Sequence, residues 1–68
     1  MDVETLTGLL REAEEHHGPY EANAPRHHWS GFYAAYIVAR DEGRSEEEAD
    51  QEARRHMDEV LAKQEAGG

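Results

Sequence analysis

The sequence predicts an all-α protein, a small three-helix bundle whose chain runs up, down and up again. Apolar residues recur at spacings of three and four in three separate segments, as on one face of an α-helix, and no segment alternates like a half-buried strand. Glycine, proline and serine punctuate the chain between these segments. The 68 residues suffice for one domain.

The first helix is expected over residues 2–17. Residues on one face of this segment are spaced by three and four: Val3, Leu6, Leu10, Ala13 and His17. Asp2 suits the N-cap position, because its carboxylate can accept hydrogen bonds from the first-turn amides. Gly18-Pro19 is expected to end the helix, since glycine adopts the left-handed conformation and proline interrupts helical hydrogen bonding.

The second helix is expected over residues 26–42, with its start signalled by Pro25, a favoured first-turn residue, or by Ser30, a possible cap, and its end by Gly43. From Trp29 to Ala39 the segment carries no charge, which predicts a central helix buried on all sides. Small residues on one side would allow another helix to approach closely, at Gly31, Ala35 and Val38. We therefore expect the bundle to form a homodimer.

The third helix is expected over residues 46–65. Ser45 and Glu48 have the spacing of a capping box, in which each side chain binds the other residue's backbone amide. The apolar stripe that follows is narrow: Ala49, Ala53, His56, Met57, Val60 and Leu61. One domain comprising residues 1–68 is the expected organisation.

Charge and composition exclude several classes of function. Sixteen acidic residues against seven basic ones give a net charge of −9, which repels phosphate backbones and disfavours nucleic acid as a partner. There is no cysteine for disulfides or thiolate ligands, and no apolar run approaches the length of a membrane span. We expect a cytoplasmic protein without a membrane partner.

The stretch HHGPYEANAPRHHW, residues 16–29, contains four of the five histidines and the only tryptophan. One interpretation is a rigid structural corner across which Tyr20 and Trp29 pack. The alternative is a site for a divalent transition metal such as zinc or nickel, because imidazole is a common ligand of these ions. Its predicted ligands are His17, His28 and His56, with His16, His27 or an acidic residue as a further ligand.

Catalysis is not expected. The only serines, Ser30 and Ser45, are explained as turn or cap residues, and no other residue stands out as a nucleophile beside a base. The predicted protein is therefore not an enzyme and needs no cofactor, unless the histidines bind a metal.

Aromatic residues supply the predicted interaction surface. Tryptophan and tyrosine are enriched at the energetically dominant positions of protein interfaces. Two narrow, alanine-rich stripes offer little area to cover them, so we expect part of this group to contact a partner. The candidate interaction residues are Tyr20, Trp29, Phe32, Tyr33 and Tyr36. The predicted function is a small acidic helical module that acts by protein–protein contact, as a homo-oligomer and with a further protein.

Residues 12–49 resemble short helical bacterial sequences associated with the glyoxalase/bleomycin-resistance label. The resemblance is carried by a few motifs: His16-His17-Gly18, Tyr20-Glu21, Pro25, His28-Trp29, Tyr33-Ala34-Ala35-Tyr36, Ala39-Arg40, Gly43 and Glu48-Ala49. The glyoxalase fold is built from βαβββ units, which this sequence does not offer. The resemblance implies a compact module accessory to a larger protein, or one that sequesters an aromatic small molecule or antibiotic.

Overall fold

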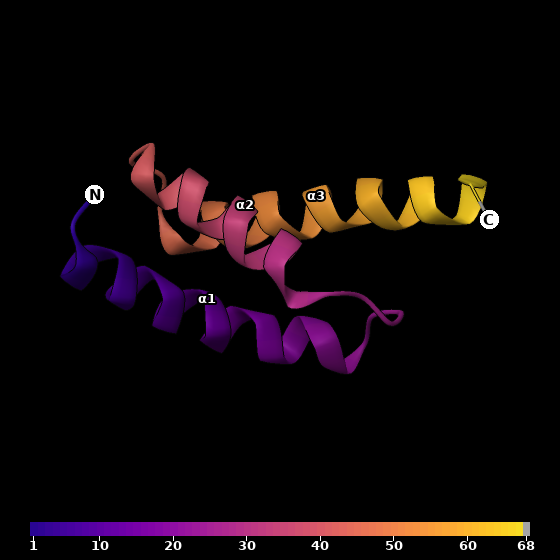
Figure 1. Cartoon of the computed structure of the whole chain (residues 1–68), viewed down its shortest axis with the longest axis horizontal. Coiled ribbons are helices and arrows are strands. Elements are labelled where there is room, and N and C mark those ends of the chain that lie inside the picture. The colour runs from indigo at the N-terminus through magenta and orange to yellow at the C-terminus, as the bar shows by residue number, and fades with distance from the viewer. Residues whose placement is uncertain (68) are drawn as a thin grey trace.

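A computed structural model describes residues 1–67 and confirms the three-helix bundle (Figure 1). The helices are α1 (Val3–Ala22), α2 (Trp29–Asp41) and α3 (Glu46–Gly67). Successive helices run in opposite directions, and α3 continues well past the start of α2 (Figure 1). None of the helices in this described part of the chain is both long and apolar enough to cross a bilayer.

Local sequence signals explain most of the helix ends. Asp2 caps α1 by accepting a hydrogen bond of 2.7 Å from the Thr5 amide. The predicted capping box of α3 is present, with reciprocal bonds of 3.0 and 3.2 Å between Ser45 and Glu48. Between α2 and α3, Gly43 has a φ of +92°, a conformation that most other residues avoid. These caps satisfy backbone groups that the helix termini leave unpaired.

The predicted end of the first helix at Gly18-Pro19 is wrong, because α1 continues through Pro19 to Ala22. Proline normally disfavours a helical residue before it by clashing with that residue's Cβ and backbone amide. Gly18 has no Cβ and keeps a negative φ, so the clash is reduced. Pro19 has no amide hydrogen for the Glu15 carbonyl, but Glu15 is exposed, and water can replace that bond. The extra turn carries Tyr20 into the core.

The second helix also begins later than predicted, at Trp29, and the connecting loop spans residues 23–28. His28 is its N-cap: the ring Nδ1 accepts a hydrogen bond of 3.2 Å from the Ser30 amide. Neither Pro25 nor Ser30 starts the helix. The loop therefore has enough length to turn back toward the end of α1.

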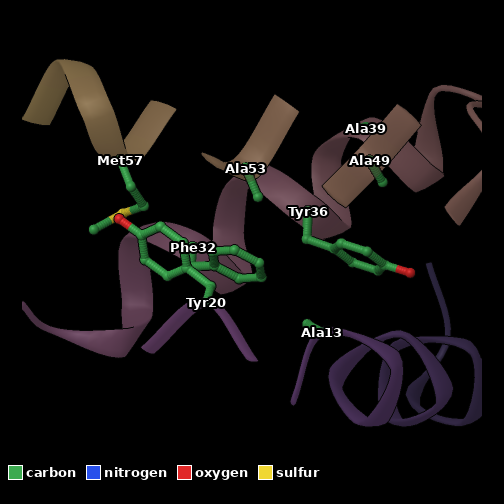
Figure 2. Close-up of a cluster of buried hydrophobic side chains, with 8 residues drawn as sticks. All are labelled: Ala13, Tyr20, Phe32, Tyr36, Ala39, Ala49, Ala53 and Met57. Atoms are coloured by element: carbon green, nitrogen blue, oxygen red, sulfur yellow. The ribbon is translucent and has the colours of Figure 1, made fainter. Parts of the chain in front are cut away.

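The core forms where aromatic rings of α1 and α2 pack against alanines. Its buried residues are Ala13, Tyr20, Phe32, Tyr36, Ala39, Ala49, Ala53 and Met57 (Figure 2). The rings of Tyr20 and Phe32 stack with their centroids 5.2 Å apart. The alanine side chains of α1 and α3 are small, so the backbones of these helices can approach the aromatic rings closely. The narrow apolar stripe of α3 can therefore cover the large aromatic side chains of α2.

The prediction that the second helix is buried on all sides is wrong. Trp29 remains 53% exposed and Val38 58% exposed. The predicted packing of Trp29 across the corner is also wrong, because Trp29 lies against Tyr33 and His28, whereas Tyr20 packs on Phe32 and His27. Neighbouring helices cover one arc of α2 and leave its flanks accessible.

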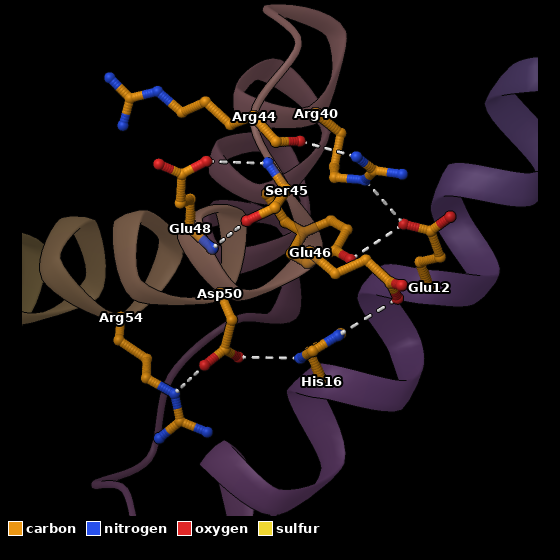
Figure 3. A network of polar contacts seen from close by, with 10 residues as sticks. Glu12, His16, Arg40, Arg44, Ser45, Glu46, Glu48, Asp50 and Arg54 are labelled. Carbon is orange, nitrogen blue, oxygen red and sulfur yellow. Dashed lines mark hydrogen bonds and ion pairs between the residues drawn. The ribbon is translucent and has the colours of Figure 1, made fainter.

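A polar network joins α1 to the other two helices at the edge of the core (Figure 3). Glu12 accepts hydrogen bonds from the Tyr36 hydroxyl at 2.9 Å and from Arg40 at 3.0 Å. One helical turn further along α1, His16 contacts Asp50 at 3.1 Å. Because Glu12 and His16 contact different helices, the network determines the position of α1 on both.

Candidate functional site

The structure separates the five aromatic residues predicted to form an interaction surface. Tyr20, Phe32 and Tyr36 are at most 8% exposed and belong to the core, so they are not available to a partner. Trp29 is exposed and Tyr33 is half-buried. Three of the five are therefore explained by folding, and two can contribute to a surface.

The accessible pair borders a groove between α1 and α2. This groove has a volume of about 420 Å³ and is lined by Leu10, His17, Glu21, Trp29 and Tyr33. Trp29 and Tyr33 lie one turn apart on α2, with their ring centroids 5.1 Å apart in an edge-to-face arrangement. Leu10 supplies the apolar wall from α1.

An apolar row on α1 extends this groove toward the N-terminus. Val3, Leu6 and Leu10 are spaced by three and four residues, and all are exposed. Helical periodicity placed them on the same face as Ala13 and His17, which are both buried. Leu9, Ala13 and Tyr20 face the core, whereas Val3, Leu6 and Leu10 stay exposed, and Leu10 lines the groove beside α2. The groove and the row together are called the α1–α2 apolar face below.

Acidic residues border this face. Burial and the nearby carboxylates of Glu14 and Glu21 raise the pKa of Tyr33 above its ordinary value. The Tyr33 hydroxyl therefore stays protonated and can donate a hydrogen bond. The face combines an apolar centre with a negatively charged edge.

At the end of the groove His17 meets His27 from the loop. Their Nε2 atoms are 3.0 Å apart, and the rings meet edge-on at 75°. His27 Nδ1 lies 2.7 Å from the Pro25 carbonyl oxygen, and His17 Nδ1 lies 3.6 Å from the Glu21 carboxylate. His17 is 7% exposed, which makes it the buried histidine of the pair.

The three predicted metal ligands lie in different environments. His17 pairs with His27, His28 caps α2, and His56 lies on α3 near Gly31. His16 contacts Asp50 and Glu46 on α3 instead of the other histidines. No cluster of three or more His, Cys, Asp or Glu side chains suited to a metal occurs within the described residues. The predicted trio of His17, His28 and His56 is therefore wrong as a single site.

A second groove of about 330 Å³ lies between α2 and α3. Ala34, Ala35 and Val38 form its apolar floor, and charged residues of α3 and the preceding turn border it. The small-residue side predicted for another helix is only partly free, because a Cβ at Gly31 would meet Met57 Sδ at 3.0 Å. Gly31 thus serves packing within the chain.

One buried hydroxyl in the core has no hydrogen-bond partner among the described residues, that of Tyr20. Burial raises the pKa of Tyr20, with the nearby Asp58 acting in the same direction. Arg54 lies over its ring at 5.5 Å from the centroid. The hydroxyl stays neutral, and the ring contributes to packing.

Searches of protein-family models, curated proteins and solved structures find no match to this chain. The resemblance described above therefore stays a prediction. Among the described residues, the candidate functional features are the α1–α2 apolar face and the histidine pair at its end.

Proposed function

We propose that this protein is a small acidic, non-enzymatic helical module that acts by protein–protein contact through the α1–α2 apolar face. The observation that carries the proposal is the exposure of large apolar side chains along one face: Val3 is 81%, Leu6 41%, Leu10 38% and Trp29 53% exposed. Scattered apolar residues are normal on protein surfaces. Val3, Leu6 and Leu10 follow one another at helical spacing on one face of α1, and Leu10 lines the groove opposite Trp29, so a partner can cover this face and Trp29 together.

The residue types support a specific interface. Trp29 and Tyr33 are of the kinds that dominate binding energy when a partner excludes water from them. The groove beside them can receive an apolar side chain, with Leu10 as its opposite wall. The acidic edge supplies the polar rim that such interfaces have.

We propose a second copy of the chain as the first partner. A two-fold axis across the α1 row would place Val3 and Leu6 of each copy beside the Trp29 groove of the other, so the same patch serves both sides. A domain of this size buries only about 60% of the surface of its unfolded chain. A dimer that covers the exposed Leu6 and Leu10 would add buried apolar area to a small core that contains several alanines.

Charge distinguishes a second copy from an unrelated partner. Two acidic edges repel each other, so added salt should strengthen self-association by screening that repulsion. A basic partner would be attracted to the same edge, and salt would weaken its binding. In that second case the monomer would bind a larger protein through the same α1–α2 apolar face.

Sedimentation equilibrium from about 5 to about 500 μM protein tests the proposal, at low and high salt. We expect a monomer–dimer equilibrium that shifts toward dimer with salt. Leu10→Gln should shift it toward monomer, whereas the matched control Val38→Gln, in the other groove, should not. A wild-type monomer at all concentrations and salts would exclude the second copy, and equal effects of the two variants would exclude this face.

A further inference from the structure

We infer that His17 and His27 form a binding site for a divalent transition-metal ion of the class that prefers imidazole, such as zinc, nickel or copper. The inference rests on the position of all four ring nitrogens. Both Nε2 atoms point to one place, 3.0 Å apart, and both Nδ1 atoms face oxygen acceptors. It is independent of the proposed protein contact.

The hydrogen atoms can be assigned from the partners. A carbonyl oxygen can only accept, so at 2.7 Å from Pro25 O the Nδ1 of His27 carries the hydrogen. In the tautomer that this contact selects, His27 presents a lone pair at Nε2. The Glu21 carboxylate, 3.6 Å from His17 Nδ1, likewise favours a hydrogen on that nitrogen. The two Nε2 atoms lie at the distance of an N–H···N hydrogen bond, so one hydrogen lies between them, and an ion that binds both nitrogens replaces that hydrogen.

The separation suits a shared metal ion. Metal–imidazole bonds are about 2.0–2.1 Å long, so two nitrogens on one tetrahedral zinc lie about 3.3 Å apart, and a right-angled arrangement brings them to about 2.9 Å. The observed 3.0 Å lies between these values. Only a few tenths of an ångström of adjustment would separate the present arrangement from either geometry.

The oxygen partners resemble those that orient histidine ligands in metal sites. A ligating histidine usually donates its other ring hydrogen to a carbonyl or carboxylate, which fixes the tautomer and the ring orientation. His27 has the Pro25 carbonyl in this position, and His17 has Glu21, one helical turn along α1. When a metal replaces the hydrogen between the two Nε2 atoms, these oxygens can hold the hydrogen that each ring keeps at Nδ1.

Packing holds the two rings in place before any ion arrives. His17 is buried and lies edge-on to Phe32 and Tyr33, with ring centroids 5.3 and 5.5 Å away. The His27 ring contacts Tyr20 at 5.2 Å. Such contacts reduce the entropy lost when the ligands bind an ion. Two protein nitrogens leave the remaining coordination positions to water or to a donor from elsewhere.

Isothermal titration with Zn²⁺ and long-range ¹H–¹⁵N NMR spectra of the imidazole rings test the site in the full chain. We expect one zinc per chain, with the ¹⁵N shifts of the Nε2 atoms of His17 and His27 changing most. His27→Gln should weaken zinc binding by about tenfold or more, because one of two protein ligands is lost. The matched control is His28→Asn, which removes the adjacent histidine but keeps a side chain suited to the N-cap, and should change affinity less than about twofold.

Circular dichroism of His27→Gln confirms that it is folded before its affinity is compared, and His17→Gln provides a second test of the same pair. Equal zinc affinity in wild type and His27→Gln would overturn the inference. So would zinc-induced shifts confined to His16, His28 or His56. Ring ¹⁵N shifts that stay unchanged on addition of zinc would show that the pair makes only its hydrogen bond and binds no metal.

Discussion

Trp29 and Phe32 lie one helical turn apart on α2, and the structure assigns them opposite energetic roles. Trp29 is the larger side chain, but it is 53% exposed, whereas Phe32 is completely buried between α1 and α3. Trp29→Ala should therefore cost much less stability than Phe32→Ala. Residue size alone would predict the reverse.

The magnitudes follow from buried area. A buried aromatic side chain removes about 150–250 Å² from water, at about 25 cal/mol per Å². For Phe32 the transfer free energy and the cavity left behind together give a cost of about 3–5 kcal/mol. About half of the Trp29 side chain is buried, so the upper limit is about 3 kcal/mol. Alanine keeps some burial and has a better helix propensity, which leaves about 1–2 kcal/mol.

Urea denaturation followed by circular dichroism measures these free energies of unfolding, at a protein concentration where sedimentation finds the monomer. A domain of this length has a total stability of about 3–10 kcal/mol, so Phe32→Ala can be largely unfolded. Phe32→Leu, with an expected cost of about 1 kcal/mol, keeps the comparison measurable. A Trp29→Ala cost equal to or above that of Phe32→Ala would refute the assignment of Trp29 to the surface.

Three further predictions concern local features. Burial opposes ionisation of Glu12, but hydrogen bonds from Arg40 and Tyr36 outweigh it and hold the pKa of Glu12 below its ordinary value of 4.5. The stability that ionised Glu12 adds to the folded protein is therefore complete above its ordinary pKa and is lost as the pH falls from there to the lower pKa of the folded state. Between about pH 6 and about pH 3, the urea midpoint should thus fall less in Glu12→Gln than in wild type. Parallel declines would contradict this. Ser45→Ala should cost about 1 kcal/mol in the same assay by removing the cap of α3, whereas Ser45→Asp should retain most of the stability, and similar losses would argue against the cap. Pro19→Ala should raise the thermal midpoint and add about 1–2 kcal/mol to the free energy of unfolding. The alanine amide can donate a hydrogen bond to the Glu15 carbonyl, and this gain exceeds the cost of a more flexible unfolded chain. A lowered midpoint would show that the proline ring itself stabilises α1.

Local signals in the sequence were enough to predict the helices and several of their ends. Ser45 and Glu48 interact through groups three residues apart, and Gly43 supplies a conformation that its neighbours lack. Such interactions depend on a few adjacent residues, so they can be recognised without knowing the tertiary structure. The three-helix fold was predictable for the same reason.

Pro19 shows where local signals compete. The proline predicts a helix end, while the aromatic Tyr20 gains burial only if the helix continues for another turn. The burial of Tyr20 against Phe32 depends on a residue twelve positions away, and the sequence does not say which effect is larger. In the structure α1 continues past the proline.

The sequence by itself determined the fold class, the acidic surface and the concentration of histidines around one turn. Only the tertiary structure decided that Trp29 is exposed, that Leu6 and Leu10 lie beside the core instead of in it, and that His17 meets His27 and not His28. Helical periodicity specifies which residues share a face, but the part of that face that is covered depends on where the neighbouring helices cross. The partner of a loop histidine depends on the path of the loop, and neighbouring residues such as His27 and His28 point in different directions along it.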